Sequence, residues 1–95
     1  MLDFEWDTDK AATNARKHGV TFTEAASVFR DPLGATVSDP AHSGAEDRYI
    51  TVGQSVAGRL LIVSHVDRGD RIRIINAREL TRSERSAYEE KKDNW

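Results

Sequence analysis

Three stretches with the alternating pattern of β-strands follow one another in the second half of the chain, separated only by short turns. They cover residues 48–55, 59–66 and 71–77. Gly58 and Gly69 lie in the two turns between them. Strands joined this closely pair as an antiparallel meander, so any fold of this chain must accommodate that sheet. The middle stretch contains Leu60-Leu61-Ile62-Val63, a run typical of a strand covered on both faces.

The first half of the chain predicts a short strand followed by two helices. Residues 2–6 alternate as a strand does, and Asp7 can cap a helix that reaches about Lys17, with Gly19 ending it. Thr21-Phe22-Thr23-Glu24 fits a capping box, in which the first and last side chains satisfy each other's backbone donors. The helix that it opens runs to about Phe29-Arg30, where Asp31-Pro32 stops it.

Two further elements complete the expected order. Residues 34–38 predict a short edge strand, and residues 39–47 the longest loop. Thr81-Arg82-Ser83-Glu84 is a second capping box that opens a helix to about Lys91. The order β-α-α-β-β-β-β-α predicts an α+β fold, with an antiparallel sheet and helices packed on it. We expect residues 1–95 to form a single domain, since no linker or repeat interrupts them.

Composition limits the class of protein. The chain has no cysteine, which excludes disulfides and thiolate metal ligands. Its N-terminus carries acids and no long apolar run, so we expect no signal peptide, no membrane contact and a cytoplasmic location. Residues 1–47 hold four Lys or Arg against nine Asp or Glu, whereas residues 48–95 hold ten against seven. On a chain of net charge −2, this distribution favours a local anion site over a basic surface.

The strongest candidate for that site is a cluster of six arginines between residues 68 and 85. Strand alternation places Arg71 and Arg73 on one face, whereas Arg78 has the other parity and joins them only if the strand bends or ends before it. Arg82 and Arg85 share a helix face. Arginine binds phosphate bidentately and stays charged. The alternative is a solvated surface in which neighbouring acids neutralise these arginines.

Titratable residues elsewhere are candidates for proton transfer. Lys17 and His18 fall at a helix end, where the helix dipole alone explains cations, and they are also suited to act near a phosphate. Glu46 shares a parity with Arg48 and is either its ion-pair partner or a base. Tyr88 is either a proton donor and stacking residue or a core anchor. The remaining histidines are His65 and His42. His65 lies on an apolar strand and is most simply a hydrogen-bonding residue at the core's edge, whereas His42 lies in the polar loop and could be either a hydrogen-bonding residue or a catalytic one.

No metal-ligand spacing, phosphate-binding loop, dinucleotide fingerprint or nucleophilic serine motif occurs, so we expect neither a metal nor another cofactor.

An ordered series of short motifs also resembles the BrnT toxin family over nearly the whole chain. The matching residues are Phe4-Glu5-Trp6-Asp7, Lys10, Asn14, Lys17-His18-Gly19-Val20, Phe22, Glu24-Ala25, Phe29, Asp31-Pro32, Glu46-Asp47-Arg48, Gly53, Arg68-Gly69-Asp70, Ile72-Arg73-Ile74-Ile75, Ala77-Arg78, Thr81, Glu84-Arg85 and Tyr88-Glu89. The resemblance implies a RelE-like ribonuclease fold and a toxin that cleaves RNA and arrests translation. It also implies a BrnA-like antitoxin that dimerises through a ribbon-helix-helix domain, with two toxins and two antitoxins forming a heterotetramer that contacts DNA only through the antitoxin.

We therefore predict metal-independent RNA cleavage, in which a ribose 2′-hydroxyl attacks the adjacent phosphate. Arg73 and Arg78 would hold the phosphate, His18 or Glu46 would be the base, and Tyr88 or His65 the acid. The residues predicted to bind RNA are Lys17, Arg48, His65, Arg71, Arg82 and Arg85. The alternative is a non-catalytic binding module that acts through the antitoxin complex in repression of the operon, which the acidic net charge favours.

Overall fold

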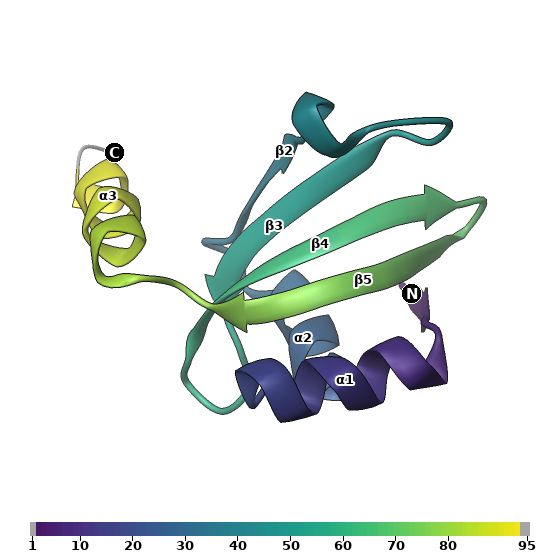
Figure 1. Ribbon diagram of the computed structural model, residues 1–95. Coiled ribbons are helices and arrows are strands. Elements are labelled where there is room, and N and C mark those ends of the chain that lie inside the picture. The colour runs from purple at the N-terminus through teal and green to yellow at the C-terminus, as the bar shows by residue number, and fades with distance from the viewer. Residues whose placement is uncertain (1, 94–95) are drawn as a thin grey trace.

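The helices and strands follow the expected order, with two additional 3-10 turns. The computed structural model describes residues 2–93. The elements are β1 (Asp3–Glu5), α1 (Thr8–His18), α2 (Phe22–Ser27), η1 (Val28–Arg30), β2 (Ala35–Ser38), η2 (Pro40–His42), β3 (Arg48–Gln54), β4 (Leu60–Arg68), β5 (Arg71–Glu79) and α3 (Arg82–Asp93) (Figure 1). None of the helices within residues 2–93 has the length and apolar character needed to span a membrane.

The five strands form one sheet in the order β1-β5-β4-β3-β2. The meander β3-β4-β5 and the edge strand β2 are antiparallel as expected. The prediction of a purely antiparallel sheet is wrong, however, because β1 pairs in parallel with β5. No short hairpin joins β1 to β5, so turn geometry does not impose an antiparallel direction on that pair.

One face of the sheet carries the core, and we call it the helix face, defined by Leu61, Val63, Ile74 and Ala77. Helices α1 and α2 pack on this side, alongside β5 (Figure 1). From the helices and the loop between them, Val20, Phe22, Ala25 and Val28 complete the buried cluster. The rings of Trp6 and Phe22 pack in a T-shaped arrangement, with centroids 5.9 Å apart. Burial of this apolar surface is the main stabilising contribution to the fold.

The opposite face, which we call the open face, is defined by Arg48, Ile50, Ile62, Ser64, Ile75, Asn76 and Arg78. No helix covers the centre of this face (Figure 1). Ile62 is therefore only half-buried, whereas its neighbours Leu61 and Val63 are fully buried. The apolar run in β4 led to the expectation of a strand covered on both faces, and this expectation is wrong.

An irregularity in β5 determines which arginines reach the open face. Ser64 pairs with Asn76 and His65 with Ile74, so Ile75 is an extra residue on the β5 side. Such a β-bulge interrupts the alternation of the strand. Ile74 and Ala77 consequently both face the helices, although their sequence parities differ. The bulge places Arg73 and Arg78 on the same side, which simple alternation does not allow.

The caps of α1 form as predicted. Asp7 accepts a hydrogen bond from the Lys10 backbone N–H at 3.0 Å, and this bond lowers the pKa of the Asp7 carboxyl. At the other end Gly19 has φ 68°, the left-handed conformation that glycine adopts without strain. The second capping box is also complete, because Thr81 Oγ1 accepts from the Glu84 N–H while Glu84 Oε1 accepts from the Thr81 N–H.

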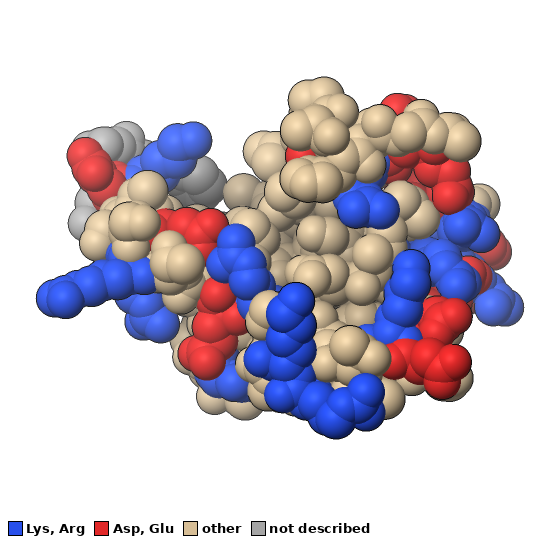
Figure 2. Space-filling model, in the orientation of Figure 1, with Lys and Arg blue, Asp and Glu red and all other residues tan. Residues whose placement is uncertain are grey.

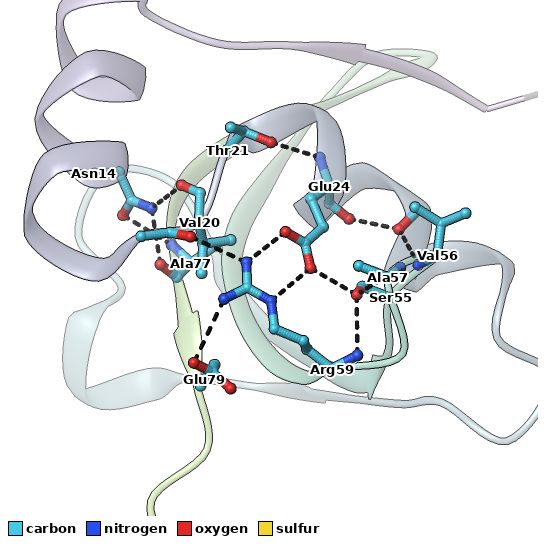
Figure 3. A network of polar contacts seen from close by, with 12 residues as sticks. Asn14, Val20, Thr21, Glu24, Ser55, Val56, Ala57, Arg59, Ala77 and Glu79 are labelled. Carbon is cyan, nitrogen blue, oxygen red and sulfur yellow. Dashed lines mark hydrogen bonds and ion pairs between the residues drawn. The ribbon is translucent and has the colours of Figure 1, made fainter.

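The first capping box forms only in part, because its glutamate has another partner. Thr21 Oγ1 accepts from the Glu24 N–H at 3.1 Å, but the Glu24 carboxylate binds Arg59 and the Ser55 hydroxyl instead of the Thr21 N–H (Figure 3). The Arg59 hydrogen bond lowers the pKa of Glu24. Arg59 also donates to the Gly19 carbonyl at 3.0 Å. One guanidinium thus joins the β3–β4 turn to α2 and to the end of α1.

Helix α3 stands apart from the sheet, so the expectation that every helix packs on it is wrong (Figure 1). Its side chains through residue 91 are exposed, apart from Glu84 and Tyr88, which are half-buried. Tyr88 Oη donates to the Leu33 carbonyl at 2.8 Å, and Glu84 pairs with Arg78. These two polar contacts join the helix to the Leu33 backbone and to Arg78 near the end of β5.

Candidate functional site

The open face is hollowed between the η2 loop and α1. Figure 2 shows this side, with Lys and Arg side chains gathered around an uncharged floor. The floor consists of Ile50, Ile62, Ser64, Ile75 and Asn76, in a hollow of about 380 Å³ whose remaining wall residues are Lys10, Asp39, His42, Arg48 and Arg78. An adjoining hollow of about 330 Å³ shares Lys10, His42, Arg48 and Ile75, and adds Glu46, Arg68 and Arg73.

Two of the cations in these hollows lack a carboxylate partner. Lys10 comes from the first turn of α1 and Arg48 begins β3. Within the described part of the chain, neither side chain forms an ion pair. The Nε atom of Arg48 is buried without a hydrogen-bond partner, which is a costly arrangement for a polar group. These two cations are available to an incoming anion.

Arg73 and Arg78 reach the same face but already bind carboxylates. Arg73 donates to Glu5 on the neighbouring strand at 2.7 Å. Arg78 holds Glu84 with a bidentate pair at 2.8 and 3.0 Å. This contact lowers the pKa of Glu84 to about 2, so the carboxylate stays charged at neutral pH. The alternative predicted from the sequence, in which neighbouring acids neutralise the arginines, therefore describes Arg73 and Arg78 well. A phosphate that binds either arginine would have to share it with its glutamate or displace that glutamate.

Lys17 and His18 lie at the C-terminus of α1, where they line a third hollow beside the first two. This hollow also contains Lys10, Ile75 and Asn76, which continue into the open face. The structure thus places the predicted Lys-His pair next to the arginine strand. The helix dipole favours cations at this end, so the dipole alone also explains why Lys17 and His18 occur here.

Glu46 lies at the rim of the second hollow, where it pairs with Arg68 at 2.7 Å. The ion pair expected between Glu46 and Arg48 is absent from the described residues. Arg68 extends from the end of β4 and takes both carboxylate oxygens. Arg48 is thereby left without a carboxylate.

His65 is separated from the open face by the sheet itself. Its side chain lies on the helix face, where 4% of the residue is exposed, and it packs edge-on against Phe29 at 4.9 Å. Nε2 is 2.7 Å from Thr51 Oγ1, whereas Nδ1 is buried without a partner. Burial lowers the pKa of the ring and favours its neutral form. The structure therefore gives His65 the hydrogen-bonding role at the core's edge.

The remaining predicted residues do not converge on the hollows. Tyr88 and Arg85 line a separate hollow beside Leu33 and Leu60. Burial raises the pKa of the Tyr88 phenol, so it stays protonated at neutral pH. Arg82 is exposed on α3, and Arg71 is exposed at the start of β5. The arginine cluster of the sequence is thus divided between the open face and its periphery.

Lys10 and Asp39 were not predicted from the sequence to belong to the site, and the role of His42 was left open between hydrogen bonding and catalysis. The first belongs to a helix assigned only a structural role, and the other two lie in the segment expected to be a loop. The sequence Asp39-Pro40-Ala41-His42 carried a recognisable feature, since proline favours the start of a helical turn and such a turn brings residues three apart together. Among the described residues, no group of three His, Cys, Asp or Glu is arranged to hold a metal ion.

Comparison with known proteins gives the family. Residues 6–84 match the family model described as "Ribonuclease toxin, BrnT, of type II toxin-antitoxin system". The crystal structure of the Brucella abortus ribonuclease toxin BrnT is similar in fold, with a TM-score of 0.65 and 23% sequence identity over 86% of this chain and 100% of that one. No curated protein matches the chain significantly. The family match spans most of the chain and includes every element of the open face, and the chain therefore belongs to the BrnT family of type II toxin–antitoxin ribonuclease toxins.

Proposed function

We propose that this chain cleaves RNA on the open face without a metal ion and thereby inhibits translation. The observation that carries the proposal is the convergence of Lys10, Arg48, Arg73 and Arg78 on two adjoining hollows of the open face, the first of which has an uncharged floor. These cations come from α1, β3 and β5, elements far apart in the sequence. Cations directed at one point stabilise the additional negative charge of a phosphodiester transition state.

The reaction proposed is an internal transesterification, in which the phosphoryl group passes from the 5′-oxygen to the 2′-oxygen. The ribose 2′-hydroxyl loses its proton and attacks the adjacent phosphorus, the bond to the 5′-oxygen breaks, and the 5′-oxygen takes up a proton. Of the proton carriers predicted from the sequence, His18 and Glu46 lie beside the hollows. His65 and Tyr88 lie elsewhere, so their positions do not support the role of acid.

The proposal includes a partner. We infer that a BrnA-like antitoxin with a ribbon-helix-helix domain neutralises the chain in the cytoplasm, as a complex of two toxins and two antitoxins that reaches DNA only through the antitoxin. Membership of a type II toxin–antitoxin family supports the existence of a protein antitoxin. We also group the fold with the RelE-like ribonucleases, because a meander sheet carries helices on one face and cations on the other.

The proposed activity is tested by inducing the chain without an antitoxin. We expect growth arrest, and primer extension should map new RNA ends. Cleavage by the purified chain should persist in EDTA, and the products should end in a cyclic phosphate. Arg73→Ala should slow cleavage roughly 10²–10³-fold, as removal of one transition-state hydrogen-bond donor does in other enzymes. Cleavage that EDTA abolishes would contradict the metal-independent mechanism.

A second candidate function is a binding module that acts through the antitoxin complex in operon repression. One observation favours it, since carboxylates already occupy the guanidinium groups of Arg73 and Arg78. In that case induction would leave growth and RNA intact, while the antitoxin complex would still bind operator DNA.

A further inference from the structure

Asp39 and His42 form a polar pair at the edge of the open face. His42 Nδ1 lies 2.9 Å from Asp39 Oδ2. A carboxylate only accepts hydrogen bonds, so the ring nitrogen must be the donor. In the neutral ring this contact leaves Nε2 with a lone pair, as a base requires. The imidazole is 67% exposed, whereas the carboxylate that orients it is 14% exposed.

The loop that carries this pair is fixed to the sheet beside Arg48. The Asp39 backbone N–H donates to the Arg48 carbonyl at 2.8 Å. The Ser43 hydroxyl donates to the Asp39 carbonyl and accepts from the Arg48 N–H, each at 2.9 Å. The position of the imidazole is therefore coupled through short contacts to the first residue of β3.

The surroundings of His42 suit reaction at a phosphate. It lines both hollows together with Lys10 and Arg48, the two cations that lack a carboxylate partner among the described residues. An anion bound by these cations would lie in the hollows that His42 also lines. A base, a group that orients it and cations for the phosphate are thus present together, which is the arrangement expected for activation of a hydroxyl.

We propose that His42, oriented by Asp39, is the proton-transfer residue of RNA cleavage. Nε2 takes the proton of the 2′-hydroxyl as the 2′-oxygen bonds to phosphorus. The phosphorus–5′-oxygen bond breaks, the 5′-oxygen takes a proton from water, and the resulting hydroxide takes the proton from His42. No oxidant, reductant or metal enters this balance. The inference rests on the proposed function and replaces His18 and Glu46 as the base.

The test measures single-turnover cleavage of a labelled messenger transcript, in buffer and in a translation extract. His42→Ala should slow cleavage about 10²–10⁴-fold, the usual contribution of a general base. Because the side chain is exposed, added imidazole should enter the space and restore part of the rate. A purely structural role for His42 would not respond to imidazole.

Asp39→Asn tests the orienting role. The amide can donate to Nδ1 and so favour the tautomer that lacks a lone pair on Nε2, and kcat should fall about tenfold or more with KM little changed. Asp70→Asn removes the same charge from an exposed turn outside both hollows and should leave cleavage unchanged.

The outcomes separate the two proposals. RNA left intact by the wild-type chain in both conditions would contradict the proposed function. If the wild-type chain cleaves RNA, then a fully active His42→Ala variant, or a loss that imidazole fails to restore, would overturn this inference alone.

Discussion

At the scale of single residues, the cations of the open face differ in whether a carboxylate already holds them. Lys10 and Arg48 have no ion-pair partner among the described residues, whereas Arg73 and Arg78 are each paired with a glutamate. An anion that binds an unpaired cation gains the full electrostatic attraction, while one that binds a paired cation must compete with the acid. Phosphate affinity should therefore depend most on the unpaired residues.

Lys10→Met and Arg48→Met should each weaken RNA binding, with KM rising more than kcat falls. Each variant should also reduce the slope of log affinity against log salt by about 1, because one fewer phosphate contact releases counterions. Lys91→Met and Arg30→Met remove the same charges from exposed positions outside the site and serve as matched controls. Equal effects of site and control variants would show that only net charge matters. Filter binding over a range of salt concentrations measures this difference.

His65 should make stability depend on pH. Burial lowers its pKa in the folded state, so the unfolded chain binds a proton more readily. The contribution of the neutral His65 ring to the free energy of unfolding is fully present above the pKa of about 6.5 that the ring has in the unfolded chain. This contribution is lost as the pH falls below that value toward the pKa of the folded state. Urea unfolding should therefore show a larger loss of stability from pH 7.5 to pH 5.5 in the wild-type chain than in His65→Gln. Identical losses would assign the pH dependence to other groups.

At the scale of elements, a side chain takes the place of a missing strand beside β5. Strand β1 pairs with residues 71–73 only. Further along, the buried Asn14 side chain donates to the Ala77 carbonyl at 2.8 Å and accepts from the Ala77 N–H at 3.1 Å (Figure 3). It also donates to the Val20 carbonyl. Asn14 thus satisfies the backbone of β5 next to the bulge and ties α1 to it.

Asn14→Ala should destabilise the fold by roughly 2–4 kcal/mol, because it leaves buried backbone groups without partners. Asn76→Ala alters an exposed amide in the same bulge and should change the unfolding free energy by less than about 0.5 kcal/mol. Urea denaturation followed by tryptophan fluorescence compares the two variants. A small effect at Asn14 would mean that water replaces its hydrogen bonds.

Some elements and contacts of the fold could be predicted from the sequence and others could not. Local patterns predicted the meander, the Asp7 cap and the Thr81 box, because neighbours in the sequence determine each of them. The parallel pairing of β1 and the competition of Arg59 for Glu24 depend on residues distant in the chain. The candidate site was likewise predicted only in part. The arginine-rich strand was predicted, but no local pattern indicates the bulge that places Arg73 and Arg78 on one face. His42 meets the other residues of the hollow only in the folded chain.

At the scale of the whole molecule, stability is distributed unevenly. The core lies between the sheet and the helices α1 and α2, and none of the described side chains of α3 belongs to it. Segments with few apolar contacts open at low free-energy cost. We expect the backbone amides of α3 to exchange with deuterium at least about 100-fold faster than those of β4, as measured by hydrogen-exchange mass spectrometry. Equal protection would show that the polar contacts of Tyr88 and Glu84 hold α3 as firmly as the core.

The extra residue at Ile75 has a consequence for comparing this chain with its relatives. In a relative whose β5 lacks that residue, the side chains after this point would face the other side of the sheet from those at the same positions in this chain. An alignment without a gap there would match Arg78 to a residue facing the helices. Functional positions in this strand should therefore be transferred between homologues by superposition, with the insertion located first.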